Sequence, residues 1–200
     1  MDITEFWSLI EGARAHLADT GPDADSDGKA VSAFLVQRLA GTSELTIFEF
    51  EQHFTRLHAA LLRWDVWAAA YLINRGCSDD SFMDFRAALI VQGQPWYERV
   101  LAEPDALAEH PEVRSVAAGT RGFALFQEIV NYIAAHAYEQ LTGGDQDGED
   151  ELSDFHEAYG AFAGPARPEP EDLGEDFDFD DPAEMRARLP RLAELFLTGR

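Results

Sequence analysis

A short corner between two apolar segments constrains this fold more than any other part of the sequence. From Val66 to Ile73, eight consecutive residues carry no charge, which indicates a helix that is buried on most sides. Gly76 suits the left-handed position just past a helix end, and Ser78 suits the cap of a second helix over residues 80–92. A corner this short joins helices that lie roughly antiparallel. We therefore expect a central helical hairpin.

Two charged residues lie on apolar faces of this hairpin. The neighbours of Asp65 and of Arg86 at helical spacings of three and four are all apolar. A buried charge that loses its partner costs about 3–5 kcal/mol, so we predict an Asp65–Arg86 ion pair. The alternative is a ligand-binding cleft beside the hairpin, in which Arg86 receives an anion and Asp65 orients it. Trp64 and Asp80 would then supply further stacking and polar groups.

Four motifs in the first half of the chain carry a resemblance to a known family. They are FW-x-LI at Phe6–Ile10, WDVWAAAYLI at Trp64–Ile73, GCSDD at Gly76–Asp80 and F-x-x-FR-x-x-LI at Phe82–Ile90. With these motifs the chain resembles the bacterial family called domain of unknown function 4240. The resemblance implies a small, largely helical intracellular protein and no assigned reaction. The chain departs from the family's pattern at Ala68, Arg75 and Ser81, where glycine is usual, and at Ala88, where tryptophan is usual.

Helical periodicity continues outside the hairpin. We expect further helices over residues 4–18, 30–39, 123–141 and 184–197, and one from residue 44 that continues into the hairpin, either unbroken or with a kink near Arg63. No segment shows a pattern that predicts a β-strand. The expected fold class is therefore all-α, a compact multi-helix domain around the central hairpin. Its parts are a helical core domain over residues 1–142, an acidic, loop-rich segment over 143–182, and a C-terminal helix over 183–200 that packs back on the core.

The negative charge of the chain is concentrated near its C-terminal end. The net charge is −23, and the stretch from Asp145 to Glu184 holds sixteen acidic residues and a single base, so it contributes 15 of these charges. Such a balance argues against binding to nucleic-acid phosphates and to anionic membranes, and it favours a basic protein partner. Within this stretch Asp and Phe alternate from Asp176 to Asp181. We expect Phe177 and Phe179 to pack inward while the acids face water.

The remaining composition limits the setting of the protein. With 200 residues, of which 46% are hydrophobic, the chain can bury a sizeable core. Its single cysteine, Cys77, excludes an internal disulfide framework. The first residues show neither the basic nor the apolar region of a signal peptide. We therefore expect a cytoplasmic location.

No residue pattern specifies a reaction. Cys77 has no nearby histidine in the sequence, so we interpret it as a packed corner residue rather than a nucleophile. The D-x-D-x-D-G run that begins at Asp23 lacks the glutamate of a calcium loop, because Phe34 takes its place. His53 and His58 are five residues apart, which is unsuited to chelation by one helix face. We expect no catalytic residue, no metal site and no cofactor.

Two hypotheses about function follow. The first is a non-enzymatic binding or regulatory protein whose acidic surface engages a basic partner. The second is an enzyme or small-ligand binder that uses the cleft lined by Trp64, Asp65, Asp80 and Arg86. The sequence does not determine the oligomeric state.

Overall fold

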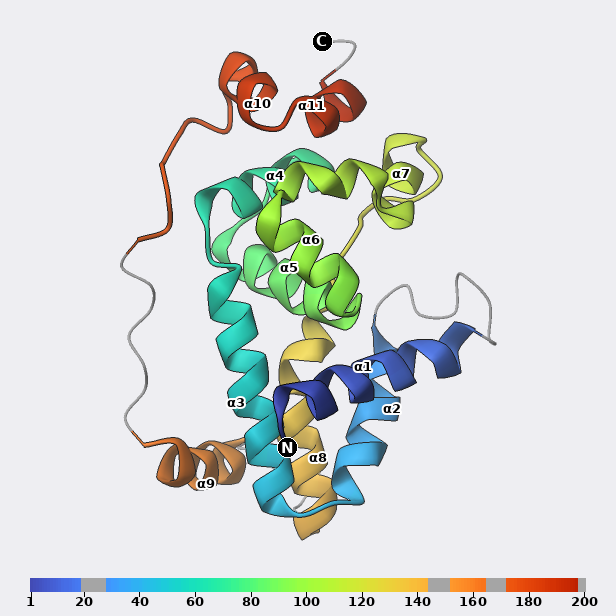
Figure 1. The fold of residues 1–200 in the computed structure, drawn as a ribbon, viewed down its shortest axis with the longest axis vertical. Coiled ribbons are helices and arrows are strands. Elements are labelled where there is room, and N and C mark those ends of the chain that lie inside the picture. The colour runs from blue at the N-terminus through green and yellow to red at the C-terminus, as the bar shows by residue number, and fades with distance from the viewer. Residues whose placement is uncertain (19–27, 144–151, 165–171, 198–200) are drawn as a thin grey trace. The chain divides into compact units, whose positions relative to one another are not determined.

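The described part of the chain is helical throughout. The computed structural model describes residues 1–18, 28–143, 152–164 and 172–197. All regular elements in these ranges are α-helices or short 3-10 helices (Figure 1), so the predicted all-α class is confirmed. None of the described helices combines the length and the apolar character that a membrane crossing requires.

Two compact units make up the chain. The first unit consists of Met1–Leu57 and Glu128–Glu169, and the second of His58–Gln127 and Pro170–Arg200. Each unit is therefore assembled from two separate stretches of sequence. The helix that begins at Glu44 contributes to both units, because its last residues lie beyond Leu57.

The first unit contains helices α1, α2, α8 and α9, the 3-10 helix η2 and the part of α3 up to Leu57. Their bounds are α1 Ile3–Ala18, α2 Lys29–Ala40, α3 Glu44–Ala60, η2 Glu128–Tyr132, α8 Ile133–Thr142 and α9 Ser153–Ala163. Helix α2 packs against both α1 and α8, and α9 packs against α8. The core joins α1 to α3 through the fully buried rings of Phe6 and Phe50, whose centroids are 5.0 Å apart.

The second unit contains the central hairpin and the C-terminal helices. Its elements are α4 Trp64–Asn74, α5 Asp79–Val91, α6 Gln94–Ala102, η1 Pro104–Glu109, α7 Pro111–Ala117, α10 Pro182–Arg188 and α11 Pro190–Phe196. Helix α4 buries residues all round, as its uncharged sequence predicts. Helix α11 packs against both α4 and η1, so the C-terminal end of the chain is part of this unit.

The corner of the hairpin differs from its prediction in one residue. Ser78 caps α5 as expected, because its Oγ accepts a hydrogen bond from the Ser81 amide at 3.2 Å. The left-handed residue that ends α4 is Arg75, with φ 60° and ψ 40°, and its amide donates to the carbonyl of Tyr71. The prediction placed this conformation at Gly76 and was wrong by one position. A non-glycine residue in this region is disfavoured.

The chain breaks near Arg63, so the first alternative, an unbroken helix from residue 44 into the hairpin, is wrong. Helix α3 ends at Ala60, and Arg63 adopts an extended conformation with φ −144° and ψ 146°. The amide of Trp64 donates to the carbonyl of Leu173 at 2.9 Å instead of to a helical carbonyl. A tertiary hydrogen bond therefore accompanies a break that has neither glycine nor proline to cause it.

The expected helix over residues 123–141 also begins later than predicted. Residues 123–127 form a loop, and the side chains of Phe123 and Phe126 are 63% and 45% exposed rather than inward. The side chain of Asn74 fixes this loop, because it donates to the carbonyl of Ala124 at 3.2 Å and accepts from its amide at 3.1 Å. Leu125, with φ 55°, is buried in this loop together with Ala124 and Gln127.

A single C-terminal helix over residues 184–197 was predicted, and the structure has two. Pro190 starts the second helix, and Leu189 between the helices is not helical, with φ −129° and ψ 59°. Proline has no amide hydrogen and disfavours a helical conformation in the residue before it. The break therefore follows directly from Pro190.

Candidate functional site

The four residues predicted to form a ligand site lie in the central hairpin. Trp64 and Asp65 begin α4, Asp80 is exposed in the first turn of α5, and Arg86 lies in the middle of α5. Asp65 bonds to the guanidinium of Arg63 and accepts a hydrogen bond from the amide of Val66 at 2.8 Å. The role of these residues in binding a ligand stays a prediction.

The predicted Asp65–Arg86 ion pair is wrong. Arg86 instead donates to the backbone carbonyl of His58 at 3.1 Å, and its guanidinium lies 4.9 Å from the centre of the Phe82 ring. Asp65 forms an ion pair with Arg63, which is two residues away. Each charge therefore has a partner other than the one predicted, Asp65 within two residues and Arg86 at the end of α3.

His58 completes a reciprocal contact between the end of α3 and α5. Its Nε2 lies 2.9 Å from the carbonyl of Met83, and since a carbonyl can only accept, Nε2 carries the hydrogen. Burial and the nearby Arg86 lower the pKa of His58 to about 4. The neutral imidazole of His58 therefore donates a hydrogen bond to α5, and the backbone carbonyl of His58 accepts one from Arg86.

An aromatic row crosses the hairpin beside these contacts. The ring of Trp67 stacks between Trp64 and Phe82, with centroid distances of 5.6 Å and 4.8 Å. Its Nε1 donates to the carbonyl of Cys77 at 2.9 Å. This row fixes the two helices to each other and to the corner that joins them.

Residues Asp172–Asp181, which we call the acidic strap, run along α4. The ring of Phe179 lies edge-to-face with the ring of Trp64, with centroids 6.1 Å apart, and it also contacts the ring of Tyr71, with centroids 5.6 Å apart. The hydroxyl of Tyr71 donates to the carboxylate of Asp180 at 2.6 Å, which raises the pKa of Tyr71. Together with the Trp64–Leu173 hydrogen bond, these contacts hold the strap against the helix.

Arg188 of α10 fastens the middle of the acidic strap. Its guanidinium lies 4.3 Å from the centre of the Phe177 ring and 2.9 Å from the carboxylate of Glu175. Arg188 holds the pKa of Glu175 below its usual range. Phe177 and Phe179 are half-buried while the neighbouring aspartates are exposed, so the predicted alternation is confirmed.

The exposed carboxylates of the acidic strap differ in their internal contacts. Asp178 accepts from the amide of Asp180 at 2.8 Å, and Asp181 accepts from the amide of Ala183 and so caps α10. Each of these carboxylates uses one oxygen in this way. The strap therefore presents a row of carboxylates whose positions are fixed by their own backbone contacts.

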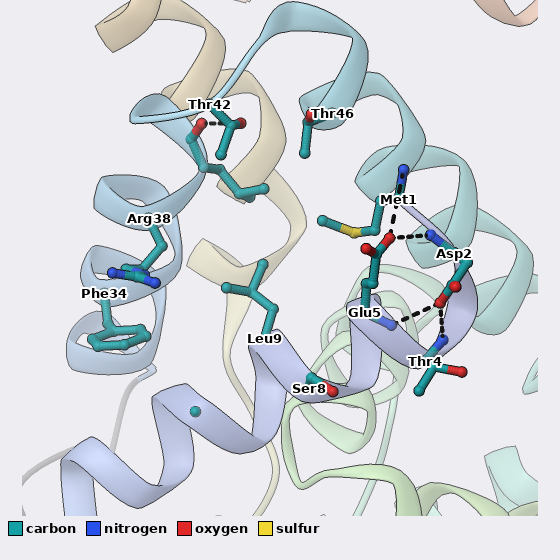
Figure 2. A pocket seen from close by; sticks show the side chains of 12 residues that line it. Met1, Asp2, Thr4, Glu5, Ser8, Leu9, Phe34, Arg38, Thr42 and Thr46 are labelled. Carbon is teal, nitrogen blue, oxygen red and sulfur yellow. Dashed lines mark hydrogen bonds and ion pairs between the residues drawn. The ribbon is translucent and has the colours of Figure 1, made fainter.

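A groove of about 720 Å³ lies in the first unit. Figure 2 shows Phe34 and Arg38 of α2 on one side and the start of α1 on the other. Asp2 accepts from the amides of Thr4 and Glu5 at 2.7 and 2.9 Å, and Glu5 accepts from the amide of Asp2 at 2.7 Å. The Glu5 amide lowers the pKa of Asp2. These two carboxylates form a capping box for α1.

A second pocket, which we call the α4–α10 pocket, lies in the second unit and has a volume of about 430 Å³. Residues from α4, the end of the acidic strap, α10 and α11 line it. Leu72 and Met185 are its most buried apolar side chains, and Arg75 and Arg186 are its two basic residues. Neither arginine was singled out as a site residue from the sequence.

The other motifs that were interpreted as structural rather than functional are either described by local contacts or lie outside the described residues. Burial and the neighbouring Asp84 raise the pKa of Cys77 to about 12, which keeps it a thiol. His53 lies 3.1 Å from the carbonyl of Met1. The D-x-D-x-D-G run is outside the described residues up to Asp27. In the part of the chain that the structure describes, no group of three or more His, Cys, Asp or Glu side chains is placed to hold a metal ion.

Glu51 on α3 predicts a pH-dependent stability of the first unit. Burial raises the pKa of Glu51 to about 7, above its unfolded value of about 4.5. The folded state therefore holds this proton more tightly. The resulting stabilisation is fully present below pH 4.5 and is lost as the pH rises through 7. We expect Glu51→Gln to raise the free energy of unfolding by about 1–2 kcal/mol at pH 8 and to change it little at pH 5. Thermal unfolding at both values tests this. Glu157→Gln on exposed α9 should show no such difference, and an equal response of both variants would contradict the assignment.

Comparison with known proteins identifies the family of this chain. No curated protein matches the chain, and no solved structure matches it. The family described as "Protein of unknown function (DUF4240)" matches residues 1–140. This range includes the central hairpin, while the acidic strap lies beyond it. Because the match covers well over half of the sequence, the chain belongs to the DUF4240 family.

Proposed function

We propose that this protein is a non-catalytic binding protein whose acidic strap engages a basic segment of a partner protein. The observation that carries this proposal is the two-sided character of the strap. Phe177 and Phe179 hold one side through ring contacts with Trp64, Tyr71 and Arg188. The opposite side exposes aspartates at alternate positions.

This arrangement favours association in two ways. A segment that is already held in place loses less conformational freedom when a partner binds. The strap also belongs to a chain with a net charge of −23, which attracts cationic partners over distances of about a Debye length and speeds their encounter. A lysine- or arginine-rich segment is the chemical complement of such a surface.

The alternative of an enzyme or small-ligand binder at the hairpin has less support. Trp64 contacts the rings of Trp67 and Phe179. Asp65 is bonded to Arg63, and Arg86 to the carbonyl of His58. These polar groups serve contacts within the protein, so an acid–base or anion-binding role would require them to exchange partners.

Neutralising the acidic strap tests the proposal. The triple variant Asp176→Asn, Asp178→Asn and Asp180→Asn removes three charges and keeps the side-chain oxygens that accept from the Asp180 amide and from Tyr71. We expect it to bind a synthetic decapeptide with lysine at alternate positions about tenfold more weakly at 50 mM NaCl, since each exposed pair contributes about 0.2–1 kcal/mol. Isothermal titration calorimetry measures this affinity.

A matched control separates the acidic strap from the overall charge. The variant Glu98→Gln, Glu128→Gln and Glu157→Gln removes three exposed charges outside the strap. Its affinity for the decapeptide should stay within about twofold of the unmodified protein. If both variants weaken binding equally, the peptide responds to net charge alone and the proposal fails.

A further inference from the structure

Two arginines line the α4–α10 pocket of a protein that is otherwise strongly acidic. The chain has 38 acidic residues and 15 lysines and arginines. The arginines that form ion pairs in the described residues include Arg63, Arg99 and Arg188. Arg75 and Arg186 form no ion pair within the described ranges, and both line this pocket. With two arginines and one carboxylate, Asp180, the lining of this pocket carries a local positive charge that attracts anions.

The backbone of Arg75 adds a second, independent observation. Arg75 ends α4 in the left-handed conformation, with φ 60°. Glycine adopts this conformation freely and is the usual residue at such a helix end. Disfavoured backbone conformations of this kind gather at functional sites. Here the residue in this conformation is an arginine, and it lines the α4–α10 pocket.

The rest of the α4–α10 pocket wall is largely apolar. Leu72 and Met185 are 6% and 1% exposed, and the rings of Phe179 and Phe196 also line the space. Asp180 is the carboxylate of the pocket, and it accepts a hydrogen bond from Tyr71. The volume of about 430 Å³ is within the range of small-molecule sites, which combine apolar walls with a few convergent polar groups.

We propose that the α4–α10 pocket binds a small amphipathic anion, with its apolar body against Leu72 and Met185 and its head group at Arg75 and Arg186. Guanidinium groups bind both carboxylates and phosphates through paired hydrogen bonds. The residues that line the pocket therefore suit a ligand with a carboxylate or phosphate head group and an aliphatic or aromatic body. This inference is independent of the partner proposed for the acidic strap, although Phe179 and Asp180 belong to both surfaces.

Four probes with the same aliphatic body test the head group. Octanoate and octyl phosphate are the anionic probes, and 1-octanol and octylammonium are the neutral and cationic controls. We expect at least one anionic probe to raise the melting temperature in a concentration-dependent way and to bind at least tenfold more tightly than either control. The comparison of octanoate with octyl phosphate identifies the preferred head group. Equal binding of octanol, or no binding of either anion, overturns the proposal.

Substitution of each arginine places the binding in the α4–α10 pocket. Arg75→Gly should raise the melting temperature of the free protein, because glycine tolerates the left-handed conformation. It should also lower the affinity for the more tightly bound anionic probe at least tenfold. Arg186→Gln should weaken it similarly. The control Arg56→Gln removes an exposed arginine of α3 and should leave the affinity unchanged. Wild-type affinity in either pocket variant, or an equal loss in the control, overturns the proposal.

Discussion

Asp105→Ala is expected to lower the free energy of unfolding by about 3–4 kcal/mol, because this buried carboxylate caps a helix from another part of the chain. Asp105 lies in η1 and is 4% exposed. It accepts from the amides of Arg191 and Leu192 at 3.0 and 2.9 Å, and from Nε of Arg191 at 3.2 Å. Leu189, which precedes α11, has no side-chain oxygen to cap it.

The measurement for Asp105 is thermal or urea unfolding followed by circular dichroism. At about 2–4 °C per kcal/mol for a chain of this size, the melting temperature should fall by roughly 10 °C. Glu103→Ala is the matched control, since Glu103 pairs with the same Arg191 at 2.7 Å but is 63% exposed. It should cost less than about 1 kcal/mol. Similar losses in the two variants would show that the cap contributes little.

Trp67→Ala is expected to cost about 3–4 kcal/mol, the range for deletion of a large aromatic side chain from a packed position. The substitution removes a ring stacked on both Trp64 and Phe82. It also removes the hydrogen bond from Nε1 to the carbonyl of Cys77 at the hairpin corner. The loss should therefore fall on the packing of α4 against α5.

Trp67→Phe separates the contribution of ring stacking from that of the hydrogen bond. It keeps an aromatic ring for stacking and loses the hydrogen bond, so it should cost about 1–1.5 kcal/mol. Urea unfolding of both variants gives the two free energies. If Trp67→Ala costs no more than Trp67→Phe, the stacked aromatic row does not hold the two helices of the hairpin together.

Local signals in the sequence predicted local features well. Ser78 caps α5 because capping requires only a side-chain oxygen and an amide three residues away. The alternation around Phe177 and Phe179 requires only a surface on which the rings can pack. The uncharged run of α4 predicted a helix buried on most sides, and the structure confirms it.

Features that depend on distant partners were not predictable in the same way. The break before α4 coincides with a hydrogen bond from Trp64 to Leu173, more than a hundred residues away. Asn74 fixes the loop at Ala124, which removes Phe123 and Phe126 from the expected helix. Periodicity reports which face of a helix is apolar, but it contains no information about such contacts.

The error about the ion pair has a related cause. Helical spacing placed Asp65 and Arg86 on apolar faces, where each charge requires a partner. In the structure Arg86 donates to the carbonyl of His58 and lies over the ring of Phe82. Backbone carbonyls are available everywhere in a fold, so a buried arginine does not by itself predict a carboxylate partner.

An NMR titration tests most directly whether the acidic strap is the binding surface. The labelled protein is titrated with the lysine-containing decapeptide, and the backbone amide shifts are followed at 50 and 500 mM NaCl. We expect the largest shifts at the amides of Leu173–Asp181, and we expect them to fade at the higher salt concentration, where the Debye length is only about 4–5 Å. Shifts that gather outside the strap, or that persist unchanged at 500 mM NaCl, would contradict this role for the strap.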